Sequence, residues 1–276
     1  RARRFGHRAG DRPRDAGVHA RHGDDGDVGA GGVEVVSNSV VAEGFENSGI
    51  VADAAVFNGD FSFDPSRSVY VTSNSVVSTG TGIFALAHQG NATIDSGTVE
   101  ITVGGVGSSG IFASTVNGAV TISSDQVVTD GDSTNGILAD SFFGDILIDS
   151  GLVHTQGDDS EGIFVRGQGV SLVSDEVNTE GADSHGIYAL GSNYAFLTPG
   201  ETIVTSGVVT TLGDRSIGIN AKAYYDGNVV ITSGSVTTQG EVGFGIFARS
   251  YYGSVDVTSI TGSIKDPSIA VVAMVE

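Results

Sequence analysis

Small and apolar residues alternate with polar ones in a unit that returns along most of the chain. The clearest part of the unit is Gly-Ile-x-Ala, and nine copies of it, with small changes, begin at residues 49, 82, 110, 136, 162, 186, 218, 245 and 270. The steps between copies run from 24 to 33 residues, a length that holds a few short strands and their turns. The pattern predicts a solenoid in which each copy forms one coil.

Two more segments of every coil alternate in the same way. Val-x-Ile-x-Ser is represented by residues 146–150 and Val-x-Thr-x-Gly by residues 153–157. β-branched residues at every second position favour strands with one buried face, and glycine is expected to supply a positive φ at each corner. We therefore predict an all-β parallel β-helix, a β-solenoid of about nine coils of three short strands. It should be right-handed, as crossovers between parallel strands generally are.

Stacked coils should bury like residues in columns. If the isoleucine and alanine of Gly-Ile-x-Ala point inward, Ile111, Ile137, Ile163 and Ile187 form one continuous buried column. The residue between them then points outward. At this outward position five aromatic residues form a ladder on one face, and we take them as the candidate binding residues: Phe84, Phe112, Phe164, Tyr188 and Phe247.

Composition limits the chemistry available to the chain. There are 42 Gly and four Pro among 276 residues, which suits a fold with many corners and uninterrupted ladders. Cysteine is absent, which excludes disulfides, zinc–cysteine sites and thiol catalysis. No run of 18 apolar residues occurs, so we expect no membrane-spanning helix.

Charge divides the chain in two. Residues 1–32 hold seven of the 13 Lys and Arg and five of the 33 Asp and Glu, and they show no repeat, so we predict a disordered or non-native segment there. Residues 33–276 form the predicted β-helix domain and carry 28 acids against six bases, about −22. A rod of this charge should repel nucleic acid, because it cannot neutralise phosphates along a track.

The repeat resembles those of autotransporter passenger domains, the β-helical surface proteins of Gram-negative bacteria. Ser-Gly-x-Val-x-Thr-x-Gly occurs at residues 233–240 and Ser-x-Gly-Ile-x-Ala at residues 184–189, and the likeness covers about residues 33–276. It implies secretion to the cell surface or outer membrane through an export barrel, and commonly an adhesive role. Neither a signal peptide nor a barrel is found here, so we expect a passenger fragment.

The same scaffold also carries enzymes that act on polysaccharides, so an enzyme is the alternative. The candidate catalytic residues are the loop acids and histidine that neighbouring coils would bring together: Asp158, Asp159, Asp183 and His185. Paired carboxylates at a suitable separation can hydrolyse glycosidic bonds. However, His185 occupies a slot that varies freely between coils, which favours a solvated turn.

Calcium is the one cofactor that the acids suggest. Asp130 and Asp132 could lie beside Asp158 and Asp159 on stacked loops, and carboxylate oxygens are suitable calcium ligands. The acids lack a fixed spacing, so we expect no metal site and no other cofactor.

Two coils are longer than the rest, at residues 53–68 and 190–201, and carry Phe57, Phe61, Phe63, Tyr194 and Phe196. Insertions in solenoids become surface loops, and we expect these to be binding loops or lids over the aromatic ladder.

Together these features favour a non-enzymatic extracellular β-helix that serves as an adhesin or structural stalk. Its expected partners are a host surface, a glycan or another copy of itself. The ladder could contact such a partner, or could only stabilise the stack through like-on-like contacts. The alternative remains a polysaccharide lyase or glycoside hydrolase.

Overall fold

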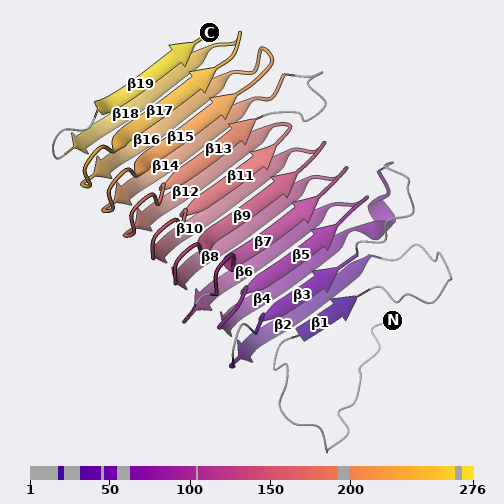
Figure 1. Ribbon diagram of the computed structural model, residues 1–276. Coiled ribbons are helices and arrows are strands. Elements are labelled where there is room, and N and C mark those ends of the chain that lie inside the picture. Colours follow the sequence, from indigo (N-terminus) through magenta and orange to yellow (C-terminus); the bar gives the residue numbers. More distant parts are fainter. Residues whose placement is uncertain are drawn as a thin grey trace, which may run out of the picture.

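The protein is a two-sheet parallel β-solenoid (Figure 1). The computed structural model describes residues 18–21, 32–44, 47–54, 63–103, 105–191, 199–264 and 269–276. Its one described helix is a 3₁₀ turn, η1 (Pro65–Arg67), whose N-terminus is capped by the Asp64 side chain. The predicted segment 1–32 lies outside the described residues except for Gly32 and a short strand at Val18–Arg21.

Each coil contributes one long and one short strand. The long strands form a nine-stranded sheet, here called the long-strand sheet: β2 (Val33–Ala42), β4 (Val69–Ser78), β6 (Ala92–Ile101), β8 (Val120–Asp130), β10 (Ile146–Gln156), β12 (Val170–Thr179), β14 (Thr202–Thr211), β16 (Val229–Thr238) and β18 (Val255–Ile264). The short strands form a ten-stranded sheet, the short-strand sheet: β1 (Val18–Arg21), β3 (Ile50–Asp53), β5 (Ile83–Ala87), β7 (Ser109–Thr115), β9 (Asn135–Ser141), β11 (Ile163–Gly167), β13 (Ile187–Gly191), β15 (Ile217–Ala223), β17 (Phe244–Ser250) and β19 (Ile269–Val275).

The coils stack in register along one axis. Every described pairing is parallel and joins equivalent repeat positions, as in Ile137↔Ile163↔Ile187. The seven coils from β4–β5 to β16–β17 have a described coil on each side. The stack thus has about seven full turns, slightly fewer than the nine repeat copies, because β2–β3 and β18–β19 form its two ends.

The first two expected segments of each coil join into one bent strand. In β10 the inward positions are 146, 148, 150, 153 and 155, so the alternation skips a residue after Ser150. The backbone stays extended through this bend. Gly151 lies at the bend, close to the preceding coil, and a Cβ on it would be 2.3 Å from the Asp125 carbonyl oxygen. Each coil is consequently built from two strands, with the third predicted side formed by the second half of the long strand.

The core lies between the sheets and is made of the predicted columns. Ile111, Ile137, Ile163 and Ile187 are all fully buried, which confirms the predicted isoleucine column. One interior column is polar: serines pair in register at the bend of every long strand, and Ser124, Ser150 and Ser174 bury hydroxyls without a hydrogen-bond partner.

The glycine of Gly-Ile-x-Ala is required for close packing. Its φ lies outside the left-handed region. The positive φ expected of corner glycines is found at Gly131 (128°) and Gly157 (124°), which directly follow long strands. A Cβ on Gly162 would lie 2.5 Å from both the Gly186 carbonyl oxygen and Val177 Cγ1. The valine column of the long strands therefore packs directly onto the glycine column, and any side chain there would push the sheets apart.

Candidate functional site

The candidate acids lie on corners that follow the long strands, where the chain turns toward the short-strand sheet. At five of these corners the residue two positions after a glycine adopts a left-handed conformation although it is not glycine itself. These residues are Ser133, Asp159, Asp183, Arg215 and Val242, with φ between 54° and 59°. Aspartate tolerates this conformation better than most residues, which gives a structural reason for Asp159 and Asp183 at this position.

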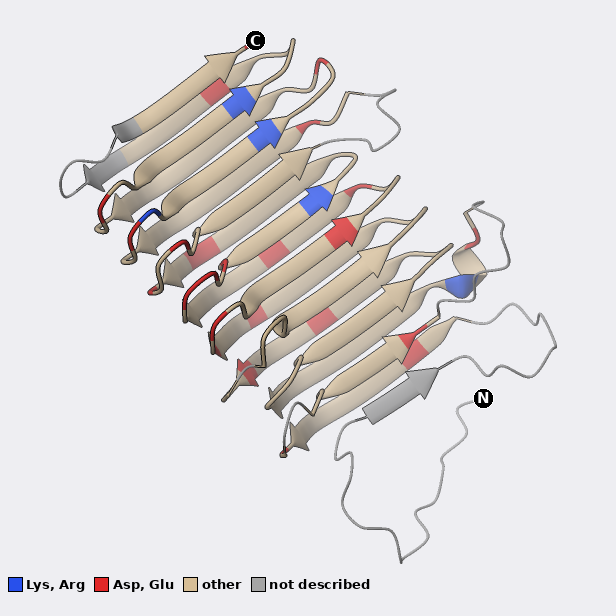
Figure 2. Cartoon of the chain, viewed as in Figure 1, with Lys and Arg blue, Asp and Glu red and all other residues tan. Residues whose placement is uncertain are grey.

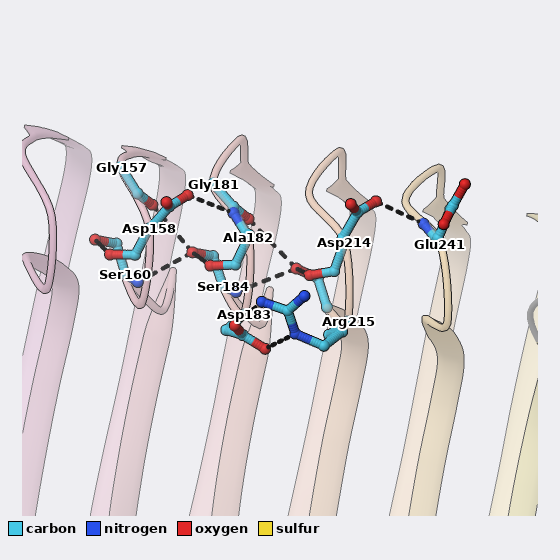
Figure 3. A network of polar contacts seen from close by, with 11 residues as sticks. Gly157, Asp158, Ser160, Gly181, Ala182, Asp183, Ser184, Asp214, Arg215 and Glu241 are labelled. Carbon is cyan, nitrogen blue, oxygen red and sulfur yellow. Dashed lines mark hydrogen bonds and ion pairs between the residues drawn. The ribbon is translucent and has the colours of Figure 1, made fainter.

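Asp158 joins its coil to the next one. The Ala182 N–H donates to Asp158 Oδ1 over 2.8 Å, and Asp158 in turn donates its N–H to Asp132 Oδ1 over 3.0 Å. The Glu241 N–H donates to Asp214 in the same manner. Figure 3 shows these carboxylates in line along the stack. The expected solvated turn is thus only half correct, because Asp158 is exposed yet caps a backbone amide of the neighbouring coil.

A serine column runs beneath the carboxylates. The N–H of Ser160 donates to Ser184 Oγ over 3.0 Å, and the N–H of Ser184 donates to Ser216 Oγ over 3.1 Å. Each hydroxyl donates to a carbonyl, as Ser184 does to Gly157 at 3.0 Å (Figure 3). The backbone N–H groups and hydroxyls of these corner serines therefore find their hydrogen-bond acceptors on neighbouring corners.

Asp183 is held by an arginine of the next coil. Arg215 Nε donates to Asp183 Oδ1 over 2.8 Å, and its Nη2 donates to the second carboxylate oxygen. These hydrogen bonds hold the pKa of Asp183 below its ordinary value. A carboxylate that is paired and kept ionised in this way is poorly suited to donate a proton as a general acid.

His185 also makes a structural contact. Its Nδ1 accepts a hydrogen bond from the Ile217 N–H over 3.3 Å, and two coils earlier Asn135 Oδ1 accepts from the Glu161 N–H in the same slot. Burial, and then the Lys222 ammonium, lower the pKa of His185, although Asp183 acts in the opposite direction. Burial raises the pKa of Glu161. His185 is thus a neutral acceptor that caps the next coil.

A cleft of about 510 Å³ lies at the opposite ends of the long strands, where β8, β10, β12 and β14 begin, and its acids are Asp145 and Glu201. None of the four candidate catalytic residues lines this cleft. In the described part of the chain no three His, Asp or Glu side chains converge to hold a metal ion. Asp130, Asp132, Asp158 and Asp159 therefore form a row along the stack without converging on a metal site.

The aromatic ladder points outward from the short-strand sheet, as predicted. All five rings are half-buried, and two pairs stack face to face: Phe84 on Phe112 at 4.9 Å between ring centroids, and Phe164 on Tyr188 at 5.0 Å. Stacked rings present their edges to solvent, so the ladder forms an apolar stripe of ring edges.

The ladder is interrupted at two coils. Leu138 takes the aromatic position in β9 and Asn220 takes it in β15. Asn220 is only 4% exposed, and its Oδ1 has no hydrogen-bond partner. Tyr188 and Phe247, one coil to either side of Asn220, consequently have no ring between them at this ladder position, although the His185 ring lies 6.3 Å from that of Tyr188.

A second outward column beside the ladder carries most of the positive charge that the described solenoid has. Arg166, Lys222 and Arg249 occupy the residue after the alanine position, and Figure 2 shows these blue segments along the short-strand sheet. Sequence reasoning missed this column. The available signal was that three of the six bases after residue 32 fall at one repeat position.

Two of these cations are neutralised and the third is not. Arg166 pairs with Asp140 at 2.7 Å, and Arg249 pairs with Glu276. Lys222 contacts no carboxylate in the described part of the chain. Its Nζ lies 5.1 Å from the Tyr188 ring centroid and 5.7 Å from that of Phe247.

The structure describes only the ends of the two long insertions, residues 53–68 and 190–201. Phe63 is 50% exposed, whereas Phe57, Phe61, Tyr194 and Phe196 lie outside the described residues.

The class of protein is defined by this geometry alone: an all-β parallel solenoid with one aromatic outer face and acidic corners. No family model, curated protein or solved structure matches the chain. No helix among the described residues is long and apolar enough to cross a bilayer.

Proposed function

We propose that the protein is a non-enzymatic binding rod, an adhesin or structural stalk on the surface of a Gram-negative bacterium. The observation that carries this proposal is the line of half-buried rings on the outer face of the short-strand sheet, which is broken at Leu138 and Asn220. Apolar surface arranged in a line along a rigid solenoid is suited to contact an extended partner such as a glycan chain or a matrix protein.

The placement of charge supports the same proposal. Many acids lie at the corners and on the long-strand sheet, while the column beside the ladder carries Arg166, Lys222 and Arg249 together with two acids, Asp53 and Asp140 (Figure 2). A chain with a net charge of −20 thus keeps one face on which an anionic or neutral partner is not repelled. The resemblance of the repeat to autotransporter passengers agrees with a surface location.

The acids of the alternative active site have structural partners. Asp158 caps the Ala182 amide, Asp183 pairs with Arg215, and His185 caps the Ile217 amide. These contacts account for the three side chains without any reaction. They favour binding over catalysis on a polysaccharide.

The test removes the rings while keeping the fold. We expect Phe84→Leu/Phe112→Leu to weaken adhesion to glycan-coated and matrix-coated surfaces by about tenfold or more, because aromatic anchors dominate such contacts. Leucine already occupies the ladder at Leu138, so the far-ultraviolet circular dichroism spectrum should not change. The matched control, Val173→Ala/Val208→Ala, removes exposed apolar groups from the long-strand sheet and should adhere like the parent.

A screen for lyase and hydrolase activity on acidic polysaccharides completes the test. We expect no turnover that depends on Asp183 or His185. If the parent degrades a polysaccharide and Asp183→Asn abolishes this activity while adhesion persists, the protein is an enzyme and the proposal is wrong.

A further inference from the structure

The interruption of the ladder in β15 creates a notch that combines two aromatic rings, a buried amide and an ammonium group. Tyr188, Asn220 and Phe247 occupy the same repeat position on β13, β15 and β17. Neighbouring strands are about 4.8 Å apart, so the two rings are separated by about 10 Å. That separation is two ladder steps, and one flat ring fits between them at the spacing that Phe84 and Phe112 already show, 4.9 Å.

The notch is at present filled by a side chain of its own coil. Lys222 Nζ lies between the facing rings and is 3.5 Å from the Tyr188 hydroxyl. An ammonium over two ring faces gains a cation–π attraction. No carboxylate of the described residues neutralises it, unlike Arg166, Arg215 and Arg249, each of which forms a salt bridge.

The base of the notch lacks a hydrogen-bond donor. Asn220 is more than nine-tenths buried and its Oδ1 is unpaired, a condition that costs free energy unless a ligand satisfies it. Beside Lys222, Arg249 extends the positive edge along the next coil, with its guanidinium 4.2 Å from the Tyr251 ring centroid. A ligand that carries a hydroxyl donor, an anionic group and an apolar ring face would therefore complement the Asn220 oxygen, the Lys222 ammonium and the two aromatic rings at one place.

We propose that the notch formed by Tyr188, Asn220, Lys222 and Phe247 binds a carboxylated pyranose, the acidic sugar residue of a glycan. The C–H faces of the sugar ring contact the two aromatic faces, and the sugar carboxylate pairs with the Lys222 ammonium. A ring hydroxyl donates to Asn220 Oδ1. The sugar ring takes the place in the ladder that the missing aromatic residue leaves. This inference rests on the proposed function and names the ligand class for one part of that face.

The chemistry separates this ligand from other anions. A free phosphate or sulfate offers charge but no ring to lie between Tyr188 and Phe247. A nucleic acid offers rings, but its many phosphates meet a chain of net charge −20. An acidic sugar combines one charge with hydroxyl donors and a compact ring.

The experiment is a calorimetric titration of the whole chain with three probes. Sialyllactose and tetragalacturonate represent the two sources of a carboxylated pyranose, and lactose is the neutral control that lacks the acidic residue. We expect at least one acidic probe to bind and lactose not to bind. Binding should weaken as salt is raised from about 0.05 to 0.5 M, because the contact includes an ion pair. Equal heats for lactose and sialyllactose, together with none for tetragalacturonate, would overturn the proposal.

Variants identify the residues involved. Lys222→Met keeps the length of the side chain and should weaken binding at least about tenfold, because a charge-assisted hydrogen bond is lost. Asn220→Leu places in the notch the residue found at Leu138 of the ladder, and should abolish binding while removing the unpaired oxygen. The control Arg166→Met changes a cation of the same column, two coils away, and should leave affinity unchanged.

The outcomes separate this inference from the proposed function. If the chain adheres to surfaces and loses adhesion in Phe84→Leu/Phe112→Leu, but Lys222→Met binds acidic probes like the parent, the notch assignment is wrong and the binding rod stands. If the probes bind and Lys222→Met fails to bind them while no surface is recognised, the notch stands and the adhesive function is wrong. Should Asn220→Leu not fold, Lys222→Met alone decides.

Discussion

The glycine column gives the most direct test of how the two sheets fit together, and Gly162→Ala is the substitution to make. Gly162 precedes the buried Ile163 at the start of β11. A Cβ on Gly162 would lie 2.5 Å from the Gly186 carbonyl oxygen and 2.5 Å from Val177 Cγ1. Ordinary contacts of a Cβ are 3.4 to 4 Å, so both neighbours would have to retreat by about 1 Å.

The expected loss has two parts. Overpacking a filled interior costs about 1–3 kcal/mol. The displaced Gly186 carbonyl also accepts the hydrogen bond from the Ile163 N–H, 3.0 Å long, and weakening that bond removes up to about 1 kcal/mol. We therefore expect Gly162→Ala to lower the free energy of unfolding by about 2–4 kcal/mol.

The assay is urea denaturation followed by circular dichroism, with two comparison variants. Gly107→Ala places a Cβ in open space but at φ +84°, so it isolates the cost of a left-handed conformation, about 1–2 kcal/mol. Gly162→Ala/Val177→Ala removes the valine clash and leaves the carbonyl clash, so it should not restore the parent midpoint. If Gly162→Ala costs less than Gly107→Ala, close packing is not the reason for this glycine and the argument fails.

Two further predictions concern the corners. Asp158→Ala should lower the free energy of unfolding by about 1 kcal/mol because the Ala182 N–H loses its acceptor. Asp158→Asn keeps an acceptor oxygen and should melt within a degree or two of the parent. Equal losses of stability in both variants would show that the charge of Asp158 matters and its capping does not. The pKa of His185 in the folded chain is lowered below its ordinary value of 6.5. As the pH falls, His185 therefore takes up a proton in the unfolded chain before it does so in the folded chain. The free energy of unfolding should decrease as the pH drops below about 6.5. His185→Asn puts there the acceptor that Asn135 supplies two repeats earlier and should flatten the pH dependence of the melting temperature between pH 7.5 and 5.5. An unchanged slope would mean that another group titrates.

The repeat made the architecture predictable, because stacked parallel coils place every repeat position beside its own equivalents. Ile111, Ile137, Ile163 and Ile187 form the expected buried column for this reason, and the ladder residues point outward as alternation requires. Strand number was less predictable. Extended backbone on both sides of the bend at Ser150 and Gly151 looks like two strands in the sequence, but hydrogen bonding to the neighbouring coils continues through it.

The roles of the polar corner residues could not be predicted, since each depends on a residue 24 to 32 positions away. Asp158 is an exposed acid by pattern, and only the stack shows the Ala182 amide at its carboxylate. Asp183 gains its arginine, and His185 its backbone donor, from the next coil. The residue before the glycine of Gly-Ile-x-Ala varies along the sequence. In two coils it nevertheless accepts a hydrogen bond from a backbone N–H of the next coil, as asparagine (Asn135) in one and as histidine (His185) in the other.

The sequence by itself determined the solenoid, the buried and outward columns, the acidic surface and the line of aromatic residues, because these follow from periodicity and composition. The tertiary structure decided how far the rings cover one another, which of the described cations lacks a carboxylate, and that Asn220 lies buried between two aromatic rings. These properties depend on side-chain packing between coils. A pattern that treats every coil alike does not contain them, because they arise where one coil departs from its neighbours.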